Sequence, residues 1–164
     1  MSKLIATFFY VGLLRPAPGT WGSAVAIPLA WLIHWGFGFP GLIVATIALY
    51  YLGWWATKTY TKGTGIHDPG EVVIDEVVGM FIALLPLSGG LWHAGVAPHI
   101  FPYPGWVGAF VFFRIFDIWK PGPIGWADRR GNAHGVMLDD VIAGIFAAII
   151  VSALAAFSHL VLMQ

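Results

Sequence analysis

The chain has 164 residues, of which 59% are hydrophobic and only 10% are charged, and its mean hydropathy is +0.80. Water-soluble domains carry about 25% charged residues, so this chain is neither a water-soluble nor a disordered protein, and we expect one membrane-embedded domain over residues 1–164. Its eight basic and eight acidic residues cancel, which argues against nucleic-acid binding. The absence of cysteine excludes disulfides, thiolate metal sites and a cysteine nucleophile.

Three long stretches without Asp, Glu, Lys or Arg predict where the chain crosses the bilayer. They cover residues 16–57, 77–113 and 141–164, and a spanning helix needs about 20 mainly apolar residues. Pro- and Gly-rich sequence interrupts the first two stretches, so we expect an all-α membrane bundle with about five spans. The predicted spans are 22–36, 42–58, 70–87, 105–120 and 138–162.

The apolar segment 4–14 is too short to span a bilayer. Arg15 follows it directly and no small-x-small cleavage site precedes it, so we expect a retained interfacial or re-entrant helix. Lys and Arg in short loops mark the cytoplasmic side of a membrane protein. With five spans Arg114 lies within a span, and the opposite loops at 37–41 and 88–105 contain no Lys or Arg. The loops on one side carry Arg15, Lys58, Lys62, Lys120, Arg129 and Arg130.

A proline- and glycine-rich turn at residues 15–23 leads into the first predicted span. It carries hydroxyl groups at Thr20 and Ser23, near the free N–H groups that a helix N-terminus offers to phosphate. We therefore predict Thr20 and Ser23 as phosphate contacts, and a simple turn capped by threonine is the alternative.

All eight carboxylates fall on or near the predicted cytoplasmic side. Asp68 and Glu71 have the spacing of a helix capping box, so a purely structural role is an open alternative for them. Asp75 and Glu76 instead begin an apolar run, where an ionised side chain costs at least about 2.5–3.5 kcal/mol at mid-bilayer depth. Such residues face a protein interior, a water-filled cavity or an ion, and we predict a functional role for this pair.

A second acid pair, Asp139-Asp140, opens the last predicted span in a similar sequence context. Four clustered carboxylates need a counter-charge to ionise together, and hard oxygen ligands favour Mg²⁺. The predicted metal ligands are Asp68, Asp75, Glu76, Asp139 and Asp140. His67 and His134 lie on the same side, whereas the remaining histidines are expected to be structural: His34, His93, His99 and His159.

Arg114, Asp117 and Lys120 share one face of a helix because they are three residues apart. One interpretation is an internal ion-pair ladder. The other assigns Arg114 and Lys120 to an anionic substrate, with Asp117 orienting Arg114, because arginine recognises phosphate in a bidentate manner.

Carboxylates, a divalent ion and cationic side chains at a membrane surface indicate phosphoryl chemistry on a lipid headgroup. At these residues the sequence resembles the phosphatidylglycerophosphatase A family of bacterial membrane phosphatases. The resemblance lies in residues 16–23, in 67–68 with 74–80, and in 112–123 with 135–141, whereas the link at 131–135 departs from the family pattern.

The resemblance implies a Mg²⁺-dependent phosphatase that converts phosphatidylglycerophosphate to phosphatidylglycerol and phosphate at the cytoplasmic face of the bacterial inner membrane. The predicted catalytic residues are His67, Asp75, Glu76, Asp117 and Asp140. Attack by a metal-activated water and a covalent aspartyl-phosphate remain alternative mechanisms. A small ion- or proton-coupled transporter is the alternative function, although transporter sites lie near the bilayer midplane and these acids crowd one end. A membrane scaffold would leave the acid pairs unexplained.

Overall fold

The computed structural model describes residues 1–63, 66 and 69–162, and every regular element among them is a helix. This confirms the predicted all-α fold. The elements in chain order are α1 (Ser2–Ala6), the 3₁₀ helix η1 (Val11–Leu13), α2 (Pro18–Thr61), α3 (Ile74–His93), α4 (Tyr103–Trp119), α5 (Pro123–Asp128) and α6 (Ala133–Leu162).

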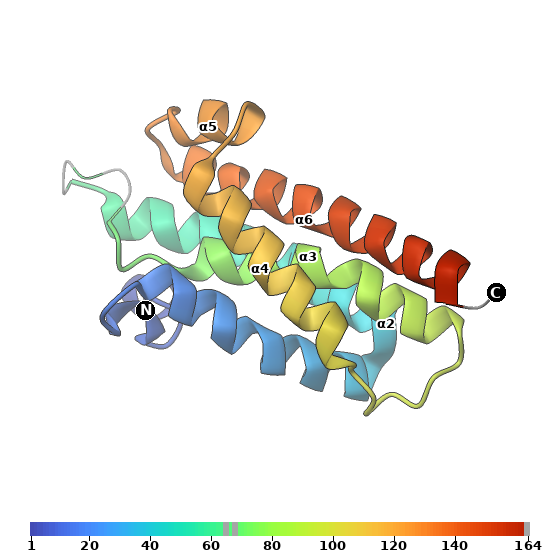
Figure 1. The fold of residues 1–164 in the computed structure, drawn as a ribbon. Helices are drawn as coiled ribbons and strands as arrows, with labels where there is room; N and C mark the ends of the chain where they lie inside the picture. Colours follow the sequence, from blue (N-terminus) through green and yellow to red (C-terminus); the bar gives the residue numbers. More distant parts are fainter. Residues whose placement is uncertain (64–65, 67–68, 163–164) are drawn as a thin grey trace.

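The longest helix, α2, joins two of the predicted spans, 22–36 and 42–58, through a sharp kink. Gly38 has a non-helical backbone conformation there, with φ 64° and ψ −163°. Only glycine adopts this conformation without strain, and a Cβ atom at this position would also collide with the Trp92 ring. Figure 1 shows the outgoing part, residues 18–37, and the returning part, residues 39–61, running in opposite directions.

Three helices of the described chain are long and apolar enough to cross a membrane: α2, α3 and α6. The expected count of about five spans is not confirmed, because α2 forms one kinked element and α4 has only 17 residues. The start of α3 also differs from the prediction. The helix begins at Ile74 rather than near residue 70, and Val73 at its N-terminus donates its N–H to the carbonyl of Ala6 at 2.9 Å.

The N-terminal segment forms two short helices, α1 and η1, rather than one helix over residues 4–14. Positive φ angles at Phe8, Phe9 and Tyr10 separate them. Within this segment, Gly12 lies against the main chain of Glu71, where a side chain would collide with the carbonyl oxygen. The segment therefore braces the chain that leads into α3.

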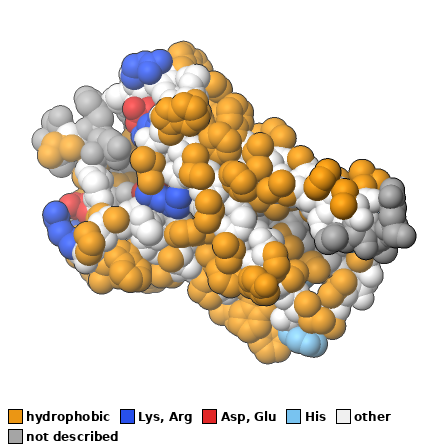
Figure 2. All heavy atoms as spheres, in the orientation of Figure 1, with side chains coloured by type: hydrophobic (Ala, Val, Ile, Leu, Met, Phe, Trp, Pro, Cys, Tyr) orange, Lys and Arg blue, Asp and Glu red, His pale blue; other side chains and the backbone are white. Residues whose placement is uncertain are grey.

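Helix α3 lies at the centre of the bundle and packs against α2, α4 and α6. Its apolar side chains, such as Val77, Phe81 and Leu84, are fully buried. Figure 2 shows hydrophobic side chains over most of the visible face, while Lys, Arg, Asp and Glu gather at the end that carries the N-terminus and α5. The molecule thus has one charged end and an apolar body.

Candidate active site at the charged end of the bundle

Four helix ends meet at the charged end: the beginnings of α2, α3 and α6, and the end of α4 (Figure 1). Helix α2 approaches the charged side chains of α3 and α4 at Gly19. A Cβ atom on Gly19 would collide with the Glu76 carboxylate of α3 and would come within 3.2 Å of Arg114 Nη1 of α4. The first turn of α2 therefore closes one side of a site whose charged groups come from the other helices.

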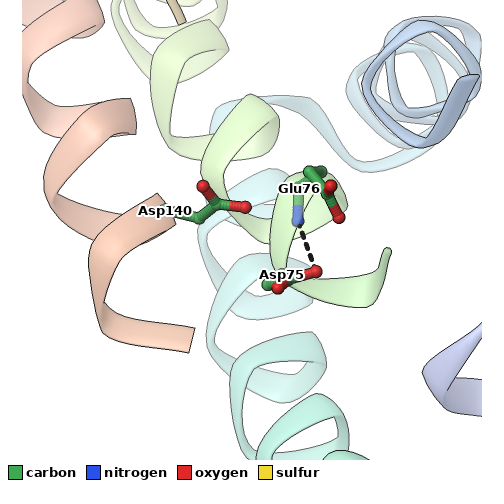
Figure 3. Close-up of side chains that lie close together, drawn as sticks. All are labelled: Asp75, Glu76 and Asp140. Carbon is green, nitrogen blue, oxygen red and sulfur yellow. Dashed lines mark hydrogen bonds between the residues drawn. The ribbon is translucent and has the colours of Figure 1, made fainter. Parts of the chain in front are cut away.

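Three carboxylates form the centre of this site, and we call Asp75, Glu76 and Asp140 the carboxylate cluster. Each offers an oxygen atom that lies within 4.8 Å of those of the other two. Asp75 and Asp140 are only 6% and 3% exposed, and the N–H of Glu76 donates to Asp75 Oδ1 at 3.1 Å. Figure 3 shows Asp140 reaching from α6 toward the first turn of α3. The sequence prediction that acids from two distant segments meet is therefore realised by these three residues.

Two glycines explain why the acids can meet. Gly79 lies one helical turn after Asp75, and Gly144 lies one turn after Asp140. A Cβ on Gly79 would come within 2.7 Å of the Asp140 carbonyl oxygen, and a Cβ on Gly144 would collide with the Gly79 carbonyl. Small residues of this kind let two membrane helices approach through their backbones. The close crossing of α3 and α6 thus brings their first turns together.

This crossing brings Asp140, and not Asp139, next to Asp75 and Glu76. Asp139 consequently points elsewhere. Its carboxylate accepts a hydrogen bond from Lys120 Nζ at 2.8 Å, and it does not belong to the carboxylate cluster.

The carboxylate cluster fits a hard divalent cation. Its donors are all oxygen atoms, which is the ligand chemistry that Mg²⁺ prefers. The Oε2 atom of Glu76 is buried and makes no hydrogen bond with any described residue. Because a buried unsatisfied carboxylate oxygen is costly, a cation that binds it would relieve both this cost and the repulsion within the cluster.

Arg114 is the cationic group beside the carboxylate cluster. Its Nη1 atom forms an ion pair with Asp117 Oδ2 at 2.6 Å and donates a longer hydrogen bond to Ser23 Oγ at 3.5 Å. Its Nε atom is buried and has no hydrogen-bond partner among the described residues. The predicted arginine–aspartate pair is therefore present, and the guanidinium keeps an unused donor inside the site.

Lys120 does not continue this ladder. It lies beyond the end of α4 in a left-handed conformation and pairs with Asp128 of α5 and Asp139 of α6. Burial alone would lower the pKa of Lys120, but the hydrogen bonds to Asp128 and Asp139 outweigh burial and raise that pKa above its ordinary value. Lys120 is thus a permanent cation that ties α4, α5 and α6 together at the rim of the site.

The hydroxyl groups predicted on the 15–23 turn have different surroundings. Ser23 is fully buried. Its Oγ donates a hydrogen bond to the Gly19 carbonyl at 2.8 Å and accepts one from Arg114. Thr20 is half-buried on the first turn of α2. The residue that precedes the helix is Ala17, and no side chain caps the helix, so the alternative of a threonine cap is not what the structure shows.

Several predicted residues lie outside this constellation. His67 and Asp68 are outside the described residues. Glu71 accepts a hydrogen bond from the Tyr60 hydroxyl, and the hydroxyl of Tyr50 and Nδ1 of His134 lie 3.1 Å apart. In the 131–135 link, Asn132 Oδ1 accepts the N–H groups of residues 134 and 135 at 3.1 and 2.9 Å, which caps α6.

Sequence reasoning missed the roles of Gly19 and Gly144. The signal for Gly144 was present, because Asp75 and Asp140 each have a glycine four residues later. Gly19 carried no comparable signal, since only the folded chain shows its contact with Glu76 and Arg114.

Comparison with known proteins shows which family the chain is similar to. The sequence profile of the family described as phosphatidylglycerophosphatase A matches residues 4–155. The chain is 37% identical over 153 residues to phosphatidylglycerophosphatase A of Haemophilus influenzae, covering 92% of this chain and 86% of the relative. It is also 37% identical over 151 residues to phosphatidylglycerophosphatase A of Escherichia coli K12, covering 88% and 78%.

A third relative carries a different, provisional name. This Bacteroides thetaiotaomicron protein, named provisionally as a phosphatidylinositol-3-phosphatase, is 34% identical over 154 residues, which cover 91% of this chain and 90% of the relative. No solved structure matches the chain. Both names, phosphatidylglycerophosphatase A and phosphatidylinositol-3-phosphatase, describe a lipid phosphatase, and they differ in the lipid headgroup.

Proposed function

The chain belongs to the phosphatidylglycerophosphatase A family and is a phosphatase that acts on phosphoric monoesters, and we propose that its substrate is phosphatidylglycerophosphate. The products would be phosphatidylglycerol and inorganic phosphate. We further propose that the reaction depends on Mg²⁺ and takes place at the cytoplasmic face of a bacterial inner membrane.

The observation that carries the proposal is the carboxylate cluster beside Arg114 at one end of an apolar bundle. Asp75, Glu76 and Asp140 would hold Mg²⁺. When bound, this ion would neutralise the cluster and polarise the phosphoryl group. The Oε2 atom of Glu76 makes no hydrogen bond with the described residues, and this supports the assignment. The large majority of buried carboxylate oxygens accept a hydrogen bond, so one without a donor is suited to bind a cation. Asp68 stays a predicted further ligand, and Asp139 instead holds Lys120.

The residues of the chain bind the phosphate and orient it. Arg114 would donate to the phosphate oxygens through its planar guanidinium, and Asp117 and Ser23 hold that guanidinium in position. The missing side chain of Gly19 lets the first turn of α2 lie directly against Glu76 and Arg114. Lys120 stays a predicted phosphate contact at the rim, where Asp128 and Asp139 pair with it.

The proton of an attacking water can pass to a carboxylate of the cluster, and His67 is the other predicted acceptor. A direct attack by an aspartate on phosphorus is the rival mechanism. Acid quenching during turnover of a ³²P-labelled substrate distinguishes them. A covalent aspartyl-phosphate leaves label on the protein that hydroxylamine removes, whereas direct attack by water leaves no label on the protein.

The charge distribution supports the proposed orientation. Lys58, Lys120 and Arg130 lie near the ends of α2, α4 and α5 at the charged end. The connection between α3 and α4, residues 94–102, contains no lysine or arginine. By the positive-inside rule the charged end would face the cytoplasm, where the headgroup of a newly made lipid is accessible.

Phosphate release from the purified protein tests the proposal. The substrates are phosphatidylglycerophosphate, phosphatidic acid and phosphatidylinositol 3-phosphate in mixed micelles, each with Mg²⁺ or with EDTA. We expect release from phosphatidylglycerophosphate that EDTA abolishes and added Mg²⁺ restores. Release from phosphatidylinositol 3-phosphate alone would reassign the substrate, and full activity in EDTA would reject the cation.

Two variants of similar charge change test the assigned residues. Asp75→Asn removes a cluster ligand and should lower kcat at least about 100-fold, corresponding to about 2.7 kcal/mol of lost transition-state stabilisation. Glu71→Gln removes a charge at the same end but keeps an acceptor for Tyr60, so it should retain activity within about twofold. Near-normal activity of the Asp75 variant would show that the cluster is not the catalytic centre.

A further inference from the structure

A cavity of about 650 Å³ lies between the outgoing part of α2 and helix α4. This volume is typical of sites that hold small molecules. Its walls in the described part of the chain carry no Asp, Glu, Lys or Arg, and aromatic and aliphatic side chains predominate. The residues that matter for the argument are Ala24, Ile27, Trp31, Trp106, Val107 and Phe110.

One end of the cavity adjoins the candidate active site. Ala24 follows Ser23, whose hydroxyl accepts a hydrogen bond from Arg114. Phe110 lies one helical turn before Arg114 on α4. One turn corresponds to about 5.4 Å along the helix axis. The apolar cavity and the proposed phosphate site are therefore neighbours on the same two helices.

The other end is bounded by the connection that leads into α4. The indole N–H of Trp31 donates to the carbonyl of His99 at 3.0 Å, which fixes this connection to α2. From Arg114 back to Trp106 the helix rises by about 12 Å, at 1.5 Å per residue. The cavity thus extends from the charged end into the apolar body of the bundle.

We propose that this cavity holds one acyl chain of the lipid whose phosphate binds at Arg114. The inference rests on the proposed function, because it takes the substrate to be a membrane lipid. A lipid with its phosphate at the charged end must extend its chains toward the bilayer interior, and the cavity runs in that direction along α2 and α4. The described residues that line the cavity include no Asp, Glu, Lys or Arg that would need a charged ligand.

The physical role of such a chain site is orientation rather than affinity. Bilayer lipid is as apolar as the cavity, so the chain gains little hydrophobic free energy by entering. Packing one chain against α2 and α4 restricts how the headgroup approaches Arg114, and such positioning lowers the barrier of a reaction. The site should therefore affect kcat/KM for long-chain lipids and not for lipids too short to fill it.

A pair of α4 variants tests this inference. Val107 and Val111 are 39% and 44% exposed, and only Val107 lines the cavity. Val107→Trp should lower kcat/KM for dioleoyl phosphatidylglycerophosphate about tenfold and for the dihexanoyl lipid less than twofold. Val111→Trp, which lies closer to Arg114 in sequence, should change neither by more than twofold. Ala24→Phe, with the exposed Ala48→Phe as its control, repeats the test on α2.

The outcomes separate the inference from the proposed function. If the wild-type protein releases phosphate from neither lipid, the proposed function fails. Two results with an active wild-type protein would overturn the acyl-chain site. In one, Val107→Trp has the same ratio of kcat/KM for the dioleoyl and the dihexanoyl lipid as wild type. In the other, it loses activity on both lipids equally while remaining folded. A third outcome would also overturn it. If light scattering shows a dimer for wild type and a monomer for Val107→Trp, the cavity is an interface between copies of the chain.

Discussion

Replacing Asp140 by asparagine should make the metal-free protein more stable while it abolishes activity. Asp140 is 3% exposed, and the charged groups that act on it are Asp75, Asp117 and Asp139, all of the same sign. An amide of nearly the same shape removes one like charge and can donate a hydrogen bond to a neighbouring carboxylate. Most buried substitutions destabilise a protein, so a gain in stability is a specific prediction.

The magnitude follows from the geometry of the carboxylate cluster. Its oxygen atoms lie within 4.8 Å of one another, and two unit charges at that distance repel by about 3.5 kcal/mol at an effective dielectric constant of about 20. Relaxation of the side chains and protonation of a carboxylate in the metal-free cluster reduce this value, and we expect a gain of about 2 kcal/mol. For a chain of this size that corresponds to a rise in Tm of about 4–8 °C.

Asp139→Asn is the matched control, because Asp139 is the adjacent residue and is 5% exposed. Its carboxylate accepts a hydrogen bond from Lys120 at 2.8 Å, and asparagine would keep an acceptor but lose the charge assistance of a bond worth about 1.5–3 kcal/mol. The same chemical change at two neighbouring positions should therefore shift Tm in opposite directions.

The assay is thermal unfolding in detergent, followed through the fluorescence of the nine tryptophans, first in EDTA and then in Mg²⁺. Mg²⁺ at 100 times its Kd should stabilise the wild-type protein by about 2.7 kcal/mol, and Asp140→Asn should lose most of this increment. A lower Tm for Asp140→Asn than for wild type in EDTA, together with an unchanged response to Mg²⁺, would refute the reasoning.

Three further predictions concern the surroundings of the cluster. Arg114→Lys should lower kcat/KM about 100-fold, because lysine lacks the planar fork that binds phosphate; an intact rate would remove Arg114 from the site. Gly19→Ala should reduce activity at least about tenfold with little change in Tm, since its methyl group would collide with the end of the Glu76 side chain and displace that carboxylate; activity equal to wild type would show that the position of the Glu76 carboxylate does not matter. Because the pKa of Lys120 is raised, its ion pairs contribute fully below pH about 10 and are lost as pH rises through the raised value. The Tm difference between wild type and Lys120→Met should therefore stay constant from pH 7 to 9.5, and a steady decrease over this interval would contradict the ion pairs.

The sequence was sufficient for the helical class and for the grouping of acids at one end of the bundle. Composition excluded a soluble fold, and the position of the acids at the edges of apolar stretches predicted that they converge. The doublets Asp75-Glu76 and Asp139-Asp140 could be selected because an acid beside an apolar run requires a partner, and the structure groups three of these four acids. Arg114 and Asp117 followed from their three-residue spacing, and the structure confirms that they form an ion pair.

What the sequence could not provide was the contact between helices. Whether Asp139 or Asp140 meets Asp75 depends on the crossing of α3 and α6, and a shift of one residue turns a helical side chain by about 100°. The pairing of Lys120 with Asp128 and Asp139 depends on the turn that places α5. The course of α2 also depends on geometry: Gly38 breaks the helix between the two predicted segments, so residues 18–37 and 39–61 run in opposite directions.

The crossing of α3 and α6 has a consequence for the choice of ion. Gly79 and Gly144 bring the two main chains into contact, so the spacing of the acids is set by backbone, which cannot repack as side chains do. Such a rigid frame suits a small cation with a narrow range of bond lengths better than one that tolerates many. Redesigning the protein for a larger ion would therefore begin with these two glycines and leave the acids themselves in place.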